Sequence, residues 1–431
     1  MSVHAFTGAA GTGKTKRLVE KLEGRLQEAA LLPEQRVVAL TRMHGSRFRM
    51  IERLAESAAR RIVDCMTLDR FAWELVSRWR SRLRELGHAA PTEFEYDATC
   101  DAAAQLLTEP AIVAWVHHRF PVVVIDEFQD CRTGRLGIAQ GLSAKADLLV
   151  AADAFQDLSE TGQSPAVDWL DTVAHVENLT TVHRTSDGGL LQAALALRSG
   201  NPVANGGNAK FFAAHNPNVA AAFLARGIAW SGGKEVVVIS PTTEEKSPFV
   251  RDTFKRLAAK PFEKDGKKYG PYTVHWERSR ENLEGDLCER LQLADDDDAT
   301  VPAPAFPSGA TLPGQRDVEQ WVERQRRVCG QTVFSSAELR AAVHRSVQLL
   351  RAQPYRRSGL RAMTIHQAKN REFDNVLVLW PVQVPSDPEA QRRLLYNALT
   401  RAKNLATVIV QDPVPAKSRL KVSPFSMVSA P

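Results

Sequence analysis

The segment Gly8-Ala-Ala-Gly-Thr-Gly13-Lys14-Thr15 decides the fold of this chain. It satisfies the pattern GxxxxGK[ST] at every fixed position, follows a short apolar strand candidate and opens a helical pattern over 16–27. Glycines let backbone N–H groups turn inward around an anion, and a helix N-terminus adds partial positive charge. The segment therefore predicts a phosphate-binding loop, in which Lys14 would reach the β- and γ-phosphates and Thr15 would bind Mg²⁺.

A second segment completes this predicted site. The apolar run 122–125 leads directly into Asp126 and Glu127. Alone, an acidic pair after a strand is also compatible with a plain helix N-terminus. Beside a phosphate-binding loop, it predicts that Asp126 holds the Mg²⁺ shell and that Glu127 orients and deprotonates an attacking water. ATP and Mg²⁺ are thus the predicted ligands.

Short β-branched runs separated by helical patterns predict an α/β fold with parallel sheets. The runs form two series, which divide near 175–180: 36–40, 61–66, 121–125 and 147–151, then 235–240, 361–366, 375–380 and 405–410. Each series has an interruption. The first is helical and arginine-rich, about 71–118. The second, about 278–359, is irregular, except that Ser335 and Glu338 form a capping box for a helix through 350.

Composition sets broad limits on the class of protein. The chain has 431 residues and a net charge of +6, which mildly favours a polyanionic partner. Its five cysteines have no metal-site spacing and predict reduced thiols in the cytoplasm. We expect neither a signal peptide nor a membrane span. The acidic run 295–298 is more typical of a solvated loop than of a cation site.

Six segments in order resemble the motif blocks of superfamily 1 DNA helicases of the UvrD/Rep/PcrA type. The DExQD box is matched by 126–130, and the further blocks are matched by 67–73, 152–156, 179–186, 364–373 and 393–403. The resemblance covers most of the chain, from residue 8 to residue 403. It implies two RecA-like P-loop domains with mostly helical insertions, 1–178 and 179–431, the second insertion being reduced. ATP would bind between the domains.

The resemblance also implies roles for individual residues. Catalytic roles fall to Lys14, Glu127, Gln156, Arg184 and Arg401, the two arginines reaching the γ-phosphate from the second domain. Nucleotide-binding roles fall to Gly8, Ala9, Ala10, Gly11, Thr12, Gly13, Lys14, Thr15, His183 and Glu372, and Mg²⁺ binding to Thr15 and Asp126. Nucleic-acid contacts are expected at Thr41, Arg47, Phe48, Thr67, Phe71, Thr364, His366 and Lys369.

The chain departs from the family pattern at several positions. His183 stands where a tyrosine would stack on adenine, and Asn370 replaces a glycine. Only seven residues precede Gly8, so an upstream adenine-contacting glutamine is missing. Ser159 lies where the family has a base-stacking aromatic residue. Outside the blocks, basic and aromatic residues are interleaved in 47–49 and 78–84. Both segments suit either nucleic-acid binding or an amphipathic helix with solvated arginines, and for 78–84 the amphipathic helix is favoured.

Two functions follow from this sequence. The first is an ATP-dependent translocase or helicase on single-stranded or tailed DNA, with 3′-to-5′ polarity carried over from the family; RNA is not excluded. The second is a DNA-stimulated ATPase that unwinds weakly and acts as sensor or regulatory subunit beside a nuclease, in DNA repair or antiviral defence. The missing aromatic residue and the reduced insertion motivate the second, and no nuclease cluster is visible in the chain itself.

Overall fold

The computed structural model describes residues 2–42, 44–91, 95–159, 164–181, 188–201, 203, 205–264, 266–277, 280–294, 296, 298–302, 312–352, 359–384, 386–412, 419–420 and 428–429. The chain divides into two compact units. The larger comprises Met1–His275 and Leu360–Pro431, and the smaller Trp276–Gly359. The larger unit contains two six-stranded sheets, which confirms the predicted α/β fold class.

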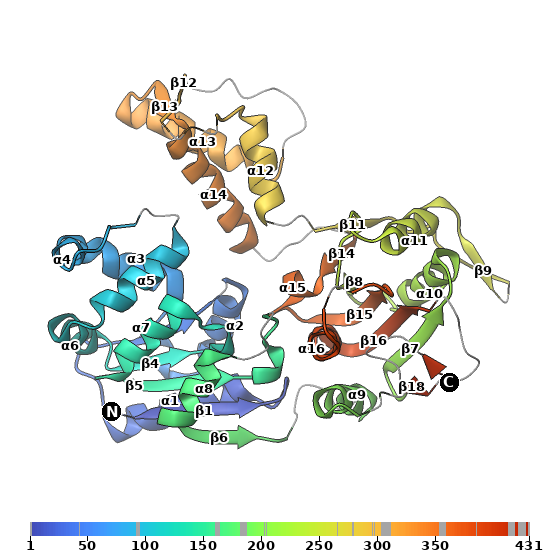
Figure 1. Cartoon of the computed structure of the whole chain (residues 1–431), viewed down its shortest axis with the longest axis horizontal. Helices are drawn as coiled ribbons and strands as arrows, with labels where there is room; N and C mark the ends of the chain where they lie inside the picture. Colours follow the sequence, from blue (N-terminus) through green and yellow to red (C-terminus); the bar gives the residue numbers. More distant parts are fainter. Residues whose placement is uncertain are drawn as a thin grey trace. The chain divides into compact units, whose positions relative to one another are not determined.

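The first sheet has the strand order β3-β2-β4-β5-β1-β6. Figure 1 labels β4, β5, β1 and β6 of this sheet. Every neighbouring pair in it is parallel. The strands are β1 (Val3–Gly8), β2 (Val37–Thr41), β3 (Val63–Thr67), β4 (Val122–Ile125), β5 (Asp147–Ala152) and β6 (His175–Leu179). The carboxyl ends of parallel strands lie at the same edge of a sheet, so the loops that follow β4, β5 and β1 leave the sheet side by side.

Both faces of the first sheet are covered, because successive strand residues point to opposite sides. Val38 and Leu40 join the core under α3, α5 and α7, whereas Val37 and Ala39 join a second core with α1 and α2. The helices are α1 (Lys14–Glu28), α2 (His44–Ala55), α3 (Leu68–Arg78), α4 (Arg80–Glu85), α5 (Tyr96–Leu106), α6 (Pro110–Arg119), α7 (Thr133–Ser143) and α8 (Pro165–Val173). Three 3₁₀ turns accompany them: η1 (Ala58–Arg61), η2 (Phe128–Asp130) and η3 (Ala154–Gln156).

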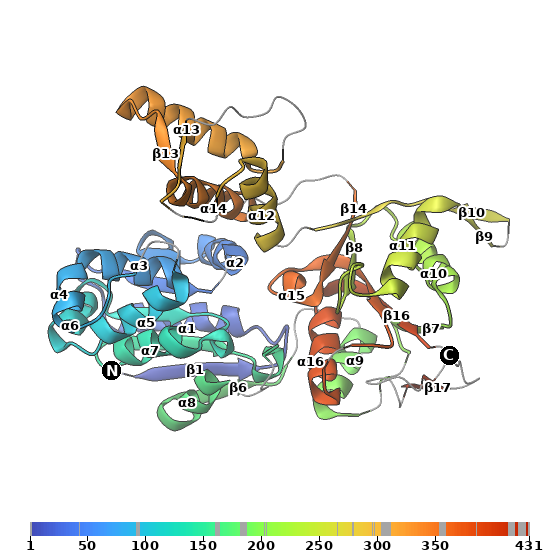
Figure 2. The same ribbon diagram turned by 45° about the horizontal axis from the view of Figure 1, so that its top comes forward.

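The second sheet has the order β11-β14-β8-β15-β16-β7. Its strands are β7 (Ala209–Ala214), β8 (Val236–Ser240), β11 (Val274–Trp276), β14 (Leu360–Thr364), β15 (Phe373–Trp380) and β16 (Ala402–Gln411). Its helices are α9 (Gly188–Ser199), α10 (Pro217–Ala229), α11 (Pro248–Ala259), α15 (Ile365–Ala368) and α16 (Pro388–Leu399). Figure 2 shows α9 and α16 side by side, and both helices contribute residues to the core of the second sheet. Two short hairpins, β9 (Phe262–Lys264) with β10 (Lys267–Tyr269) and β17 (Arg419–Leu420) with β18 (Val428–Ser429), complete this unit.

The smaller unit is more regular than its sequence suggests. Three helices, α12 (Arg280–Arg290), α13 (Gln315–Cys329) and α14 (Ser336–Ala352), pack around Leu287, Val318 and Val343. A hairpin joins β12 (Thr300–Pro302) to β13 (Val333–Ser335). The expectation of an irregular stretch is therefore wrong for much of this unit. Low hydrophobicity and many arginines in α13 conceal an amphipathic helix whose buried stripe is short.

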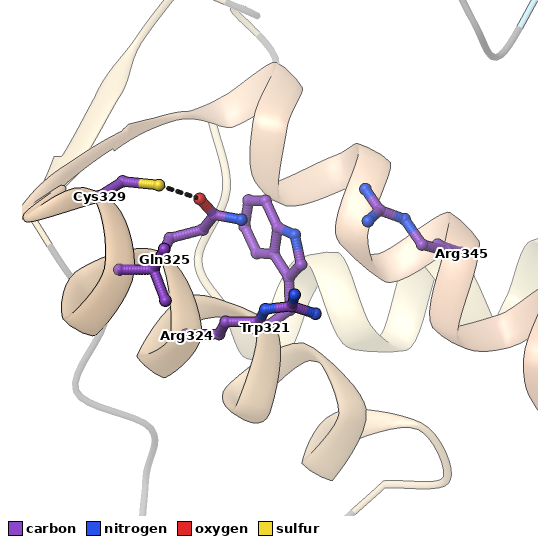
Figure 3. Close-up of a pocket in the computed structure, with 6 residues that line it drawn as sticks. Trp321, Arg324, Gln325, Cys329 and Arg345 are labelled. Carbon is purple, nitrogen blue, oxygen red and sulfur yellow. Dashed lines mark hydrogen bonds between the residues drawn. The ribbon is translucent and has the colours of Figure 1, made fainter.

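The predicted capping box in this unit is confirmed. Glu338 N–H donates to the Ser335 hydroxyl at 3.2 Å, and the Glu338 carboxylate accepts from Ser335 N–H at 2.9 Å. Trp321 packs against Phe334, with ring centroids 5.8 Å apart, and also lines a pocket of about 280 Å³. Figure 3 shows its ring among Arg324, Gln325 and Arg345. Residues 303–311 of the stretch expected to be irregular, and part of the acidic run 295–298, lie outside the described residues.

The eight predicted strands all form, with bounds that differ by up to three residues. The arginine-rich first interruption is helical, as predicted, and contains α3 to α6. Among the described helices, none is long and apolar enough to cross a membrane.

Candidate nucleotide-binding site

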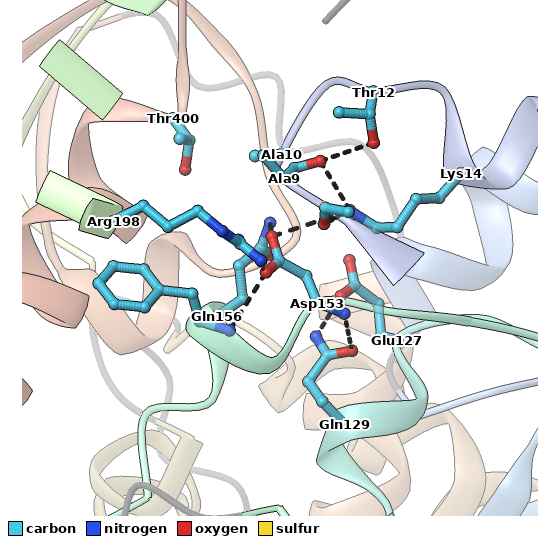
Figure 4. A network of polar contacts seen from close by, with 12 residues as sticks. Ala9, Ala10, Thr12, Lys14, Glu127, Gln129, Asp153, Gln156, Arg198 and Thr400 are labelled. Atoms are coloured by element: carbon cyan, nitrogen blue, oxygen red, sulfur yellow. Dashed lines mark hydrogen bonds and ion pairs between the residues drawn. The ribbon is translucent and has the colours of Figure 1, made fainter. Parts of the chain in front are cut away.

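The phosphate-binding loop joins β1 to α1 at the carboxyl edge of the first sheet. Gly13 adopts the left-handed conformation (φ 82°) directly before Lys14, where α1 begins. A side chain at Gly8 would place its Cβ 2.4 Å from the Leu179 carbonyl oxygen, so this position has room for glycine alone. The Lys14 ammonium donates to the carbonyl oxygens of Gly8 and Ala9, both at 2.9 Å, and so lies over the loop (Figure 4).

The acidic pair after β4 lies beside this loop. The Thr15 hydroxyl donates to an Asp126 carboxylate oxygen at 3.2 Å. Glu127 has a left-handed backbone (φ 57°), which is strained for a residue with a Cβ and which recurs at functional sites. Its carboxylate accepts a hydrogen bond from Gln129 Nε2 at 2.7 Å, which fixes its orientation.

The two neighbouring carboxyls have pKa values that are shifted in opposite directions. Burial, and then the Glu127 carboxylate, raise the pKa of Asp126 to about 6. Burial also acts to raise the pKa of Glu127, but Arg49, Lys369 and Lys14 outweigh it and hold this pKa below its usual range. Glu127 is therefore the more acidic carboxyl of the pair, and the ionised form that this favours is the state a general base requires.

Asp153, directly after β5, is the hub of a buried polar network (Figure 4). Its backbone N–H donates to Gln129 Oε1 at 3.0 Å, and its carboxylate accepts from Gln156 Nε2 at 3.1 Å. The carboxylate also lies 3.8 Å from the Lys14 ammonium. Because Gln129 binds both Asp153 and Glu127, one amide links the ends of β4 and β5. Gln156 is thereby placed beside the loop, with 4% of its surface exposed.

Side chains of the second sheet reach the same edge. The Tyr396 hydroxyl accepts from Ala10 N–H at 2.7 Å and donates to Asp153 at 3.3 Å. Arg198 Nη1 donates to the other Asp153 oxygen at 2.6 Å. Lys369 pairs with Asp130 at 2.6 Å, and the guanidinium of Arg49 lies 3.7 Å from the Glu372 carboxylate.

Of the residues after 178 that are expected to bind the nucleotide or reach its γ-phosphate, Arg401 is described by the structure, whereas His183 and Arg184 are not. Arg401 is 2% exposed, and its guanidinium donates to the carbonyl oxygens of Asn397 at 3.0 Å and Arg371 at 3.4 Å. These contacts hold the Arg401 guanidinium between α16 and the segment that precedes β15. His183 and Arg184 lie outside the described residues.

The residues expected to contact nucleic acid are largely engaged in the fold. Phe71 belongs to the core of the first sheet, and Thr41 at the end of β2 is buried. Thr67 caps α3 by accepting from Arg70 N–H, and Thr364 caps α15 in a capping box with Gln367. His366 is exposed. Lys369 is held in its ion pair, and the side chain of Phe48 lies outside the described residues.

The two basic and aromatic segments differ in their surroundings. Trp79 packs against the first core, edge to face with Trp115 at 5.9 Å, and Arg78 lies over Trp115 at 4.5 Å. This is the amphipathic packing that the sequence favours for 78–84. Arg47 and Arg49 lie on α2, where Arg49 is close enough to the Asp126–Glu127 pair to act on both pKa values.

The residues present fit ATP and Mg²⁺. The loop provides an ammonium, backbone N–H groups and the N-terminus of a fifteen-residue helix, the donors that phosphate oxygens accept from. Thr15 and Asp126 provide a hydroxyl and a carboxylate within 3.2 Å of each other, the hard oxygen donors that Mg²⁺ prefers.

Comparison with known proteins agrees with the predicted resemblance. Residues 359–409 match the family model of the UvrD-like helicase C-terminal domain. This segment runs from the start of β14 into β16 and contains the last two of the six motif blocks. The resemblance to UvrD-like helicases is thus confirmed for this C-terminal segment.

Among solved structures, the chain is similar to the helicase nonstructural protein 10 of an arterivirus, with 11% sequence identity and a TM-score of 0.40. The match covers 96% of this chain and 60% of that one, so this chain spans less than two thirds of that protein's length. A similarity this low adds nothing to the assignment. No curated protein matches the chain.

Sequence reasoning missed four residues that the structure brings to the site: Gln129, Asp153, Arg198 and Tyr396. Gln129, Asp153 and Tyr396 lie inside three of the six motif blocks, so the resemblance could have identified them. Arg198 was not, because a single arginine in the last turn of an apolar helix is indistinguishable from one that merely faces solvent.

Proposed function

We propose that this protein is an ATP-dependent translocase or helicase acting on single-stranded or tailed DNA. In the proposal, residues 1–178 and 179–431 are two RecA-like domains and ATP binds at the carboxyl edge of the first sheet. The observation that supports it most is the joining of a complete phosphate-binding loop to Asp126 and Glu127, in a chain whose 359–409 match a UvrD-like helicase domain.

In the proposed reaction, Lys14 binds the transferring phosphoryl group and Glu127 accepts a proton from the attacking water. Gln129 holds the Glu127 carboxylate in place, at 2.7 Å. Mg²⁺, held by Thr15 and Asp126, supplies positive charge to the phosphate oxygens. Arg184 and Arg401 are proposed to stabilise the charge that builds on those oxygens, and Glu372 to contact the nucleotide.

A second candidate is a DNA-stimulated ATPase that unwinds weakly and serves a nuclease or repair partner, for example in antiviral defence. One observation favours it. Ser159, at the position of the family's base-stacking aromatic residue, is bound to the Asp157 carboxylate at 3.0 Å, and Arg132 contacts both side chains. An ion cluster therefore fills the place from which a ring would stack on a base.

The experiment that separates these candidates measures ATP hydrolysis with and without single-stranded DNA, beside unwinding of a tailed duplex. We expect DNA to stimulate hydrolysis at low salt, and stimulation to fade as salt rises, because phosphate contacts release counterions. Vigorous unwinding of long duplexes by the isolated chain would favour the helicase over the second candidate. Lack of DNA stimulation at low salt would contradict both.

The 3′-to-5′ polarity is part of the proposal and is tested with duplexes that carry either a 3′ or a 5′ tail. We also place the protein in the cytoplasm, a proposal supported by the free thiols of its five cysteines.

A further inference from the structure

Two positively charged side chains share the Asp153 carboxylate. Its oxygen Oδ2 lies 3.8 Å from the Lys14 ammonium, and its oxygen Oδ1 accepts from Arg198 at 2.6 Å. The carboxylate is fully buried, whereas 32% of the Arg198 side chain is exposed. Lys14 belongs to the loop after β1, and Arg198 to α9 beside the second sheet. One carboxylate therefore holds a cation from each sheet next to the phosphate-binding loop (Figure 4).

The backbone around Arg198 is fixed by neighbours. Arg392 donates to the carbonyl oxygens of Leu197 at 3.0 Å and Arg198 at 3.2 Å, which caps the end of α9. The Arg198 guanidinium lies 5.7 Å from the centre of the Phe155 ring, which itself contacts Tyr396 edge to face. These contacts aim a long, partly exposed side chain at the loop while leaving its charged end able to change partner.

Tyr396 accepts a hydrogen bond from one of the backbone N–H donors of the loop. Its hydroxyl accepts from Ala10 N–H at 2.7 Å, and backbone N–H groups of such a loop are the donors that bind phosphate. Burial, and then the Asp153 carboxylate, raise the pKa of the Tyr396 phenol, so the hydroxyl keeps the proton that it donates to Asp153. A triphosphate that uses the Ala10 donor must displace this hydroxyl and thereby disturb the Asp153 cluster.

Charge determines how the Asp153 cluster responds to a triphosphate. Lys14 is the group that reaches the β- and γ-phosphates, so a γ-phosphate brought to it arrives close to the buried Asp153 carboxylate. Two neighbouring anions repel each other strongly where water is excluded. Arg198 touches that carboxylate and carries a planar fork of donors suited to phosphate oxygens. Moving its guanidinium between the two anions relieves the repulsion. Arg401, by contrast, donates to the backbone carbonyl oxygens of Asn397 and Arg371 and to the Thr400 hydroxyl.

We propose that Arg198 is a γ-phosphate-contacting residue, held on Asp153 until ATP arrives. The inference rests on the proposed ATPase function and adds a residue to it. Because ADP has no γ-phosphate, it leaves the Asp153–Arg198 pair in place. The pair therefore distinguishes ATP from ADP, and Arg198 gives the second sheet a preference for the ATP-bound state.

The test uses the full chain and measures the Kd of a slowly hydrolysed ATP analogue and of ADP, each with Mg²⁺, by calorimetry. For Arg198→Ala we expect analogue affinity to fall about tenfold while ADP affinity stays within about twofold, a loss near 1.4 kcal/mol confined to one nucleotide. Arg198→Lys should lose less, because it keeps the charge but not the fork. Arg226→Ala is the matched control, since the Arg226 guanidinium also lies over an aromatic ring, that of Trp230 at 4.5 Å, on a helix that does not border the loop.

Equal changes in analogue and ADP affinity, or no change in either, in a variant that melts at the wild-type temperature would overturn the role of Arg198. If Arg198→Ala does not fold, Arg198→Lys decides by the same ratio. Failure of the proposed function looks different: wild-type protein would bind neither nucleotide, or Lys14→Ala would bind the analogue as wild type does.

Discussion

The candidate ATP-site residues of the first sheet and the expected nucleic-acid contacts differ in how they relate to the fold. Lys14 and Thr15 follow β1, and Asp126 and Glu127 follow β4. These two parallel strands flank β5, so the sheet itself brings Thr15 and Asp126 within hydrogen-bonding range. Thr67 and Thr364 instead cap helices, and Phe71 fills a core. Phosphate chemistry fixes residue types at fixed spacing, whereas contacts along a nucleic-acid strand leave a sequence signal that packing and capping also produce.

Among the residues outside the first sheet, the largest expected effect concerns Arg401. If it stabilises the transferring phosphoryl group, Arg401→Ala lowers kcat about 10²-fold or more while leaving ATP affinity within several-fold, because the charge matters most in the transition state. Steady-state hydrolysis and nucleotide binding measure the two quantities, and the melting temperature controls for folding.

The buried contacts of Arg401 supply the competing result. Its guanidinium binds two backbone carbonyl oxygens of its own layer. A variant with reduced stability but unchanged kcat would limit Arg401 to holding α16 against the segment that precedes β15. Weaker ATP binding at unchanged kcat would make it a ground-state anchor.

A smaller effect is expected at Lys369. It forms an ion pair with Asp130, and 10% of the Lys369 side chain is exposed. If Lys369 also contacts a DNA phosphate, Lys369→Ala weakens single-stranded DNA binding several-fold at low salt and reduces the salt dependence of binding by about one phosphate contact. Asp130→Asn is the paired variant, because it removes the carboxylate charge and leaves the lysine. Binding unchanged in Lys369→Ala would reduce this residue to a structural ion pair.

The smallest effect tests a departure from the family pattern. Asn370 has a left-handed backbone (φ 63°), which explains why a glycine suits this position and why asparagine can replace it. We expect Asn370→Ala to lower the free energy of unfolding by about 1 kcal/mol more than Asn370→Gly does. Chemical denaturation measures both, and equal stabilities would show that backbone strain does not select the residue.

The sequence predicts the buried elements better than the exposed ones, for physical reasons. The apolar runs of β2, β4, β5, β8 and β15 are continuous because both faces of these strands are covered. The edge strand β6, His-Val-Glu-Asn-Leu, is mostly exposed and has no such run. β7 lies at the other sheet's edge and is also partly exposed.

The candidate site divides in a similar way. Thr15 and Asp126 follow from motif spacing, but the Asp153–Arg198 pair joins residues 45 positions apart from different sheets. No periodicity or spacing along the chain encodes such a contact, because it depends on how α9 is capped and where Phe155 lies. The aromatic residue sought after the 152–156 block is absent there, while Phe155 inside the block packs against the second core.

Replacement of Glu127 by glutamine tests the central claim most directly. Glu127 lies beside the loop with its pKa held below the usual range, and Gln129 donates to its carboxylate at 2.7 Å. An amide keeps its shape and most of its contacts but cannot accept a proton from water. The account predicts that Glu127→Gln binds ATP with wild-type affinity and loses turnover with and without single-stranded DNA. Turnover at the wild-type rate in this variant would contradict the assignment of the hydrolytic site.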